Sequence, residues 1–338
     1  MKIFISVIFT VLTVCFLLSS ASTSQAADTL QIITTIFPEY DWVRNVLGDN
    51  PAEIEVMQLL DNGVDLHSYQ PTADDILKLS GCDLFIYVGG ESDEWVENAL
   101  KEAVNKNMVT ISLLEALGDA IKEEELVEGM EADHEHEHEE EHEHEEDEHD
   151  HEHDHEHEEV EYDEHVWLSL RNAAVLCQKF ADAISALDPE NTALYQENAA
   201  AYIEKLNALD AEYRKAVSDA PVHTLLFGDR FPFRYLTDDY GLDYYAAFSG
   251  CSAESEASFE TIIFLTRKIN DLGLKSVMTI EGKDHRIAQT IVQNTDSKDQ
   301  QILTMDSMQS TTSKDSANGT TYLSIMEKNL EVLKEALQ

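Results

Sequence analysis

The chain has few basic residues for its length. Its 338 residues include 22 lysines and arginines against 68 aspartates and glutamates, which gives a formal net charge of −46. Such a field repels nucleic acids and anionic membranes and concentrates cations near the surface, so we expect no nucleic-acid partner. Apolar residues still make up 43% of the chain, so the acidity does not indicate wholesale disorder. The length is enough for about two domains with hydrophobic cores.

Cysteine is also scarce, with four residues in the chain and no CxxC pair. A zinc site built from thiolates would be expected to contain such a pair. Three cysteines, Cys82, Cys177 and Cys251, lie beyond the first 26 residues, and an odd number in an exported protein leaves at least one thiol unpaired. We predict that they are buried small residues, or one disulfide and a spare thiol. The sequence assigns them no function.

Motifs of common enzyme classes are missing too. The sequence has neither an HExxH metalloprotease motif nor a GxSxG nucleophile elbow, and it has no phosphate-binding glycine loop and no internal repeat. We therefore predict that the protein is not an enzyme.

The first 26 residues have the pattern of a secretory signal peptide. Lys2 precedes an apolar run from Ile3 to Leu18, and small and polar residues follow up to Ala26. The run is shorter than the about 20 residues that a membrane-spanning helix needs. We expect cleavage after Ala26 and export to the periplasm or to the outer face of the cell membrane. An uncleaved membrane anchor is the alternative.

Alternating strand and helix patterns predict an α/β fold. From Leu30 onward, short apolar strand patterns alternate with helical ones, which is typical of parallel sheets covered by helices. From Asn191 to Val217 apolar residues recur at helical spacing without glycine or proline, which predicts a helix of about 40 Å. We therefore predict two α/β lobes joined by one long rigid helix. The N-terminal lobe would span 27–170, the linking helices 171–220 and the C-terminal lobe 221–338.

Residues 121–160 interrupt this pattern. Ten of the 14 histidines lie between His134 and Glu159, where they alternate with carboxylates and show no apolar periodicity. Such a segment cannot offset the entropy of ordering it, so we predict a disordered insertion. It should bind several metal ions weakly and exchange them quickly, which makes it a collector for a site elsewhere. Protons should compete with the metal below about pH 6.

The candidate site lies where predicted strands end, because ligands of open α/β folds bind beyond the carboxyl ends of their strands. His67 follows one predicted strand, and His165 lies where the ordered pattern returns. The predicted strands of the second lobe are followed by three carboxylates, Asp229, Glu281 and Asp306. Imidazole and carboxylate ligands without thiolate suit Zn²⁺ or Mn²⁺.

The two remaining histidines outside the insertion have simpler interpretations. His223 falls inside a predicted strand and is interpreted as a core or edge residue, and His285 at a predicted helix start is interpreted as a surface residue.

Three segments resemble motifs of one protein family. GVDLHSYQPTADD, DEHVWLSLRNA and TMDSM are similar, in this order, to motifs of the metal-specific solute-binding proteins that serve ABC importers. The resemblance runs from about Ile32 to the end of the chain, and the histidine-rich insertion resembles the loop of zinc-transporting members. It implies that His67, His165 and Asp306 bind the metal. It also implies Zn²⁺ as the cargo, with Mn²⁺ as second choice, and a monomer whose partner is an ABC permease.

The resemblance fails at one ligand position. The family's remaining ligand, a His or a Glu, falls where the segment FGDRFPFRY has Gly228. The nearest oxygen donor is Asp229, which we take as the fourth candidate ligand. The alternatives for this ligand are a water, Glu281, His285 or an imidazole of the insertion.

The sequence thus predicts an extracytoplasmic protein that captures a divalent transition metal, foremost Zn²⁺, for an ABC importer. A metal-buffering surface adhesin without a transport role, or a metal-dependent hydrolase, is the alternative.

Overall fold

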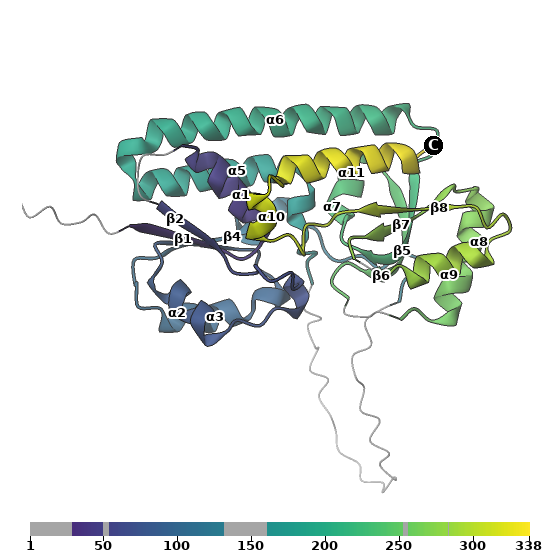
Figure 1. Cartoon of the computed structure of the whole chain (residues 1–338), viewed down its shortest axis with the longest axis horizontal. Coiled ribbons are helices and arrows are strands. Elements are labelled where there is room, and N and C mark those ends of the chain that lie inside the picture. The colour runs from purple at the N-terminus through teal and green to yellow at the C-terminus, as the bar shows by residue number, and fades with distance from the viewer. Residues whose placement is uncertain (1–28, 50–53, 132–160, 253–255, 283) are drawn as a thin grey trace, which may run out of the picture.

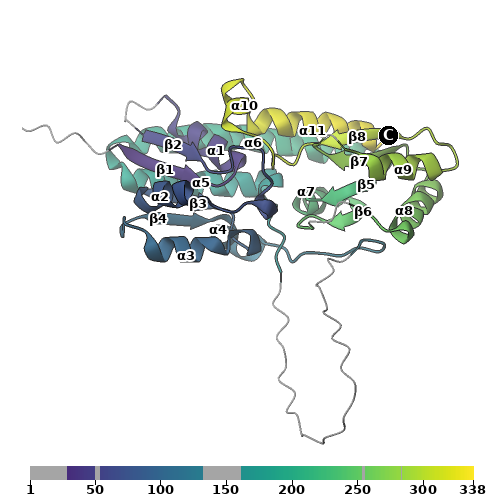
Figure 2. The same ribbon diagram turned by 60° about the horizontal axis from the view of Figure 1, so that its bottom comes forward.

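The computed structural model describes residues 29–49, 54–131, 161–252, 256–282 and 284–338. They form two four-stranded sheets in which every strand pair is parallel. The two sheets lie side by side, and the long helix α6 (Thr192–Asp219) runs along both (Figure 1; Figure 2). The prediction of two α/β lobes joined by a long helix is confirmed. The predicted signal peptide at 1–26 and the run from His134 to Glu159 lie outside the described residues.

The first lobe contains the sheet of order β2-β1-β3-β4. Local signals set its helices: Pro38 lies in the first turn of α1, and Thr72 caps α2 in a capping box with Asp75. Its elements are β1 (Leu30–Thr34), α1 (Phe37–Leu47), β2 (Ile54–Gln58), α2 (Ala73–Gly81), β3 (Leu84–Tyr87), α3 (Trp95–Glu102), β4 (Val109–Ser112) and α4 (Leu113–Leu117).

The second lobe contains the sheet of order β6-β5-β7-β8. It has the same βα alternation, because every parallel neighbour needs a crossover connection. Its elements are β5 (Thr224–Phe231), α7 (Arg234–Tyr240), β6 (Asp243–Ser249), α8 (Phe259–Leu272), β7 (Ser276–Ile280), α9 (Arg286–Asn294), β8 (Gln301–Met305), α10 (Ser313–Ala317) and α11 (Tyr322–Ala336).

Helices α5 (Leu170–Leu187) and α6 connect the lobes. The 28 residues of α6 correspond to about 42 Å at 1.5 Å per residue. Near its start, Tyr202 donates a hydrogen bond to Asp41 of α1, and near its end Tyr213 donates one to the carbonyl of Met326 in α11. One uninterrupted helix therefore holds both lobes.

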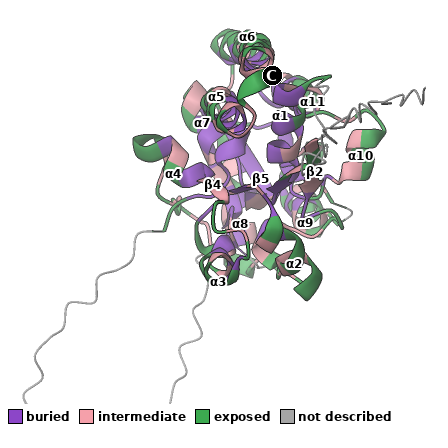
Figure 3. Ribbon diagram, turned by 90° about the vertical axis from the view of Figure 1, so that its left-hand side faces the viewer, coloured by how far each residue is buried: buried purple, intermediate pink, exposed green. Residues whose placement is uncertain are grey.

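The two lobes also share one hydrophobic core. The larger cluster of buried side chains includes Trp42 of the first lobe and Tyr322 of α11, whose rings meet edge to face at 5.0 Å. Tyr322 further donates a hydrogen bond to the carbonyl of Trp167. Figure 3 shows buried residues of α1, α11 and β5 gathered between the outer helices. Because this packing crosses the lobe boundary, it resists relative motion of the lobes.

The structure differs from the sequence predictions at three places. Residues 121–131, predicted as part of a disordered insertion, are described and lie against the second lobe, where the backbone of Glu131 donates to the carbonyl of Ala247 in β6. Strand β5 continues to Phe231 instead of ending at Phe227. His223 precedes that strand and is exposed rather than lying within it. The lobe boundaries at 170 and 221 stay a prediction. Among the described residues, no helix is long and apolar enough to cross a membrane.

Candidate metal centre

His67 lies on a one-turn helix, η1 (Leu66–Ser68), in the loop after β2. Asp65 Oδ1 accepts a hydrogen bond from the backbone N–H of His67 at 3.0 Å. The Nδ1 atom of His67 lies 2.8 Å from Ser92 Oγ and 3.4 Å from Glu164 Oε2. These contacts orient the imidazole so that its Nε2 faces His165.

His165 lies at the N-terminal end of a second one-turn helix, η4 (Val166–Leu168), and is fully buried. Asp163 Oδ1 accepts a hydrogen bond from the backbone N–H of His165 at 2.8 Å and lies 3.0 Å from its Nδ1. A carboxylate behind a metal-binding imidazole fixes its tautomer and makes it more basic. Asp163 has this position.

The two Nε2 atoms of His67 and His165 lie 3.1 Å apart. Each Nδ1 faces an acceptor: Ser92 Oγ or Glu164 for His67, and Asp163 for His165. When each Nδ1 carries the proton and donates it to this acceptor, the lone pairs of the two Nε2 atoms face one another. Two nitrogens bound to one tetrahedral zinc at 2.0–2.1 Å lie about 3.3 Å apart. The observed spacing is therefore close to that of a shared metal ion.

Cys251 joins these two histidines. Its Sγ, one ring nitrogen of His67 and one ring nitrogen of His165 all lie within 4.8 Å of one another. The residue before it, Gly250, follows β6 and lies so close to His165 that a Cβ there would be 2.9 Å from its Cε1. Sequence reasoning missed Cys251 because it has no CxxC partner. One signal was available: Cys251 follows the end of a predicted strand, as the chosen carboxylates do.

Gln309 is a second residue that the sequence did not single out. Its amide is buried beside His165. With the amide nitrogen donating to Asp65 Oδ1 at 2.6 Å, the carbonyl oxygen lies 3.0 Å from His165 Nε2 and accepts a hydrogen bond from it when Nε2 carries the proton. In the Nδ1–H tautomer of His165 the opposite amide orientation fits, with the amide nitrogen donating to Nε2. The first orientation offers a neutral oxygen ligand next to the two imidazoles.

The predicted carboxylate ligands have other partners. Asp306 Oδ1 accepts from the backbone N–H of Met308, and Asp229 accepts from the backbone N–H groups of Arg230 and Ile280. Glu281 accepts from the N–H and the hydroxyl of Ser307. Among the described His, Cys, Asp and Glu residues, the group of converging ligand atoms contains His67, His165 and Cys251 but neither Asp229 nor Asp306.

Gly228, which stands at the family's ligand position, has no room for a side chain. A Cβ there would lie 2.7 Å from the Cα and 2.9 Å from the backbone nitrogen of Ala288 in α9. Backbone atoms of a packed helix cannot move aside as a flexible side chain could. A histidine or glutamate at this position would therefore require α9 to shift.

Burial and neighbouring groups shift the pKa values of residues in the centre. Burial and the neighbouring imidazole of His165 lower the pKa of His67 well below its usual range. His67 thus stays in the neutral form that binds metal. Burial raises the pKa of Glu164 to about 7, and burial together with nearby carboxylates raises the pKa of the Cys251 thiol.

An acidic cavity leads to the centre. Its volume is about 390 Å³, and His67 and Cys251 form part of its wall. Most of its other lining residues are glutamates: Glu91, Glu94, Glu124, Glu161 and Glu164. A concave surface lined by one sign of charge raises the local concentration of counter-ions. This cavity therefore favours the entry of cations.

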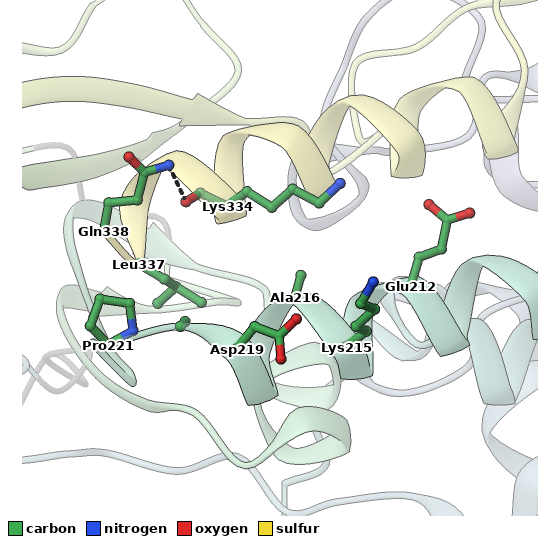
Figure 4. A pocket seen from close by; sticks show the side chains of 9 residues that line it. Glu212, Lys215, Ala216, Asp219, Pro221, Lys334, Leu337 and Gln338 are labelled. Carbon is green, nitrogen blue, oxygen red and sulfur yellow. Dashed lines mark hydrogen bonds between the residues drawn. The ribbon is translucent and has the colours of Figure 1, made fainter.

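A larger cavity, of about 660 Å³, lies away from the histidines, between the C-terminal ends of α6 and α11. Figure 4 shows charged residues of both helices around it, Glu212, Lys215 and Asp219 from α6 and Lys334 from α11. Charges of both signs line this cavity, and its lining contains no histidine or cysteine. We therefore do not assign the metal centre to this cavity, although it is the larger of the two.

Comparisons with known proteins relate the chain to one family. The family model described as "Zinc-uptake complex component A periplasmic" matches residues 32–336. The zinc-binding lipoprotein AdcA of Streptococcus pneumoniae serotype 4 is 32% identical over 337 residues, which cover 98% of this chain and 60% of that protein. The chain thus spans about 60% of the length of this relative. The high-affinity zinc uptake system protein ZnuA of Bacillus subtilis is 30% identical over 339 residues, with 97% and 96% covered.

Solved structures match over most of the chain. The crystal structure of the Zn(II)-bound ZnuA-like domain of Streptococcus pneumoniae AdcA is 28% identical, with a TM-score of 0.66, and covers 91% of this chain and 99% of that chain. The metal-dependent lipoprotein YcdH from Bacillus subtilis, at 23% identity and a TM-score of 0.69, has the same fold.

Proposed function

Because the chain belongs to the zinc-uptake complex component A family, we propose that it binds Zn²⁺ as cargo outside the cytoplasm and delivers it to an ABC importer. Relatives of similar sequence are named as zinc-binding and zinc-uptake proteins, and one is solved with Zn(II) bound. These names support transport rather than catalysis.

The observation that carries this proposal is the pair of Nε2 atoms of His67 and His165, which lie 3.1 Å apart. Both imidazoles are held from behind by acceptors at Nδ1, so neither ring must reorient to receive an ion. Preorganisation of this kind raises affinity because little ordering remains to be done on binding.

The residues around the two histidines explain how the cation is attracted and how its charge is compensated. The glutamates of the cavity attract the cation, and Asp163 and Glu164 compensate the charge that it brings to the two imidazoles. The histidine-rich run, with its ten imidazoles, would collect ions and pass them to this cavity, since Glu161 of the cavity wall is the second residue after that run's end at Glu159.

The test is zinc titration of the His67→Ala variant, with His223→Ala as the matched control. His67 is on a loop, so the fold should survive its loss. Removing groups behind a metal ligand already costs about 10–100-fold in affinity, so losing a ligand should cost about 100-fold or more. His223 is exposed and outside the centre, so its replacement should change nothing. Tight zinc binding that is equal in both variants would refute the proposal.

The identity of the permease and the monomeric state stay predictions. No feature of the described residues favours a surface adhesin or a hydrolase over transport.

A further inference from the structure

We propose that Cys251 is a zinc ligand and that its thiolate makes the centre selective for zinc over manganese. This inference rests on the proposed function and adds a thiolate ligand, which neither the family resemblance nor the sequence motifs supplied. Three groups of observations carry it: the position of the sulfur, the way its loop is held, and the loss of the usual ligand position.

The sulfur lies where a third ligand is needed. Cys251 Sγ is within 4.8 Å of one ring nitrogen of His67 and of one ring nitrogen of His165. Two ligands of one tetrahedral zinc, a nitrogen at about 2.0 Å and a sulfur at about 2.3 Å, lie about 3.5 Å apart. A shift of at most about 1.3 Å brings Sγ to this separation, and side-chain adjustments of this kind are common on binding.

The loop around Cys251 is held on both sides of the cysteine. Before it, Gly250 lies against the imidazole of His165, with no space for a Cβ. After it, the carbonyl of Ser252 accepts a hydrogen bond from Arg230 at 3.3 Å, and Arg230 also pairs with Asp65, two residues before His67. The loop is therefore fixed relative to both histidines.

The carboxylates predicted from the sequence are not brought to the two histidines. Gly228 cannot carry a side chain because of Ala288. Asp229 and Asp306 accept hydrogen bonds from backbone N–H groups of their own segments. Among the described His, Cys, Asp and Glu residues, Cys251 is the one whose ligand atom is grouped with a ring nitrogen of each histidine. The Gln309 amide oxygen, at 3.0 Å from His165 Nε2, completes a set of two imidazoles, one thiolate and one neutral oxygen.

This ligand set determines which ions the centre prefers. Thiolates select soft and borderline ions such as Zn²⁺, whereas Mn²⁺ prefers carboxylate, carbonyl and water oxygens. A centre of two imidazoles and two carboxylates, as predicted from the sequence, would bind both metals. A centre with Cys251 should bind zinc, cadmium and cobalt well and manganese poorly. When zinc binds, the Zn–S bond forms and the thiol proton is released to solvent.

The experiment uses Co²⁺ as a spectroscopic probe of the full-length protein. Cobalt bound to a thiolate gives an intense sulfur-to-metal charge-transfer absorption in the near ultraviolet that imidazole and oxygen ligands do not give. We expect this band in the wild type and in the control variant Cys82→Ala, whose cysteine is buried outside the centre. We expect no band in Cys251→Ser, together with a fall in zinc affinity of about 100-fold or more and a much smaller change in manganese affinity.

The outcomes separate this inference from the proposed function. Absence of the band in the wild type would overturn the inference even if Cys251→Ser did not fold. Full zinc affinity in Cys251→Ser would also overturn it. If His67→Ala then still lost zinc binding, the proposed function would stand without the cysteine ligand. If both variants kept full affinity, both proposals would fail.

Discussion

Gly250 lies where the protein should tolerate no side chain. A Cβ at this position would be 2.8 Å from the carbonyl oxygen of Phe231, 2.9 Å from His165 Cε1 and 3.0 Å from His165 Nδ1. Phe231 belongs to β5, whose backbone is fixed by the sheet, so it cannot give way. In Gly250→Ala the methyl group must therefore displace either the imidazole of His165 or the loop that carries Cys251.

The size of the effect follows from these distances. Extra methyl groups in packed interiors cost typically about 1–3 kcal/mol, so the metal-free protein should lose stability in this range. An ordinary contact begins near 3.4 Å, so restoring it from 2.9 Å moves the ring by about 0.5 Å. Metal–ligand distances tolerate only about 0.2 Å. Zinc affinity should therefore fall at least about tenfold, which is 1.4 kcal/mol.

Two measurements check this prediction: urea unfolding of the metal-free protein and competition titration with a zinc chelator. Gly81→Ala is the matched control, because Gly81 ends α2 and an added Cβ there has no neighbour within 4 Å. The control should keep zinc affinity and should not lose stability, since alanine favours a helix by about 0.5–1 kcal/mol over glycine. A Gly250→Ala variant with wild-type zinc affinity would refute the idea that this close approach positions the centre.

Three further predictions follow from other parts of the molecule. Deleting residues 132–159 removes ten imidazoles but none of the described ligands, so calorimetry should show the number of zinc ions fall from several to about one. The tightest affinity should stay within about tenfold, and its loss would identify a histidine of the run as a ligand. Burial raises the pKa of Asp41 from 3.8 to about 6, so its charged form costs folding free energy as pH rises through this range. Asp41→Asn should stabilise the protein near pH 8 by up to about 3 kcal/mol and hardly at all near pH 4, and equal effects in urea unfolding at both values would contradict this. Because α6 has no glycine or proline and packs on both lobes, hydrogen exchange in it should not change on zinc binding, whereas the loops of His67, His165 and Cys251 should gain protection. A strong change along α6 would identify it as a hinge.

Much of the fold follows from local sequence patterns. The apolar spacing from Asn191 to Val217 predicted α6, which spans Thr192–Asp219. Thr72 and Asp75 predicted the start of α2, and the strand patterns predicted parallel sheets. These features depend on residues a few positions apart, whose interactions are the same in any protein that contains them. The positions of His67 and His165 were also predicted, although from the family motifs around them rather than from spacing.

The rest of the centre depended on tertiary structure. Cys251 meets His67 and His165 only because β6 ends beside η4 and because Gly250 permits close approach. Asp306 is directed to its own backbone neighbour Met308, which its sequence motif does not reveal. The sequence by itself determined which elements form, that His67 follows a strand and that His165 lies where the ordered pattern returns after the insertion. Which atoms converge was decided by contacts between residues far apart in the sequence, 98 positions for the two histidines and 144 for Gln309 and His165. Such contacts are set by the packing of the whole core, and no local pattern encodes them.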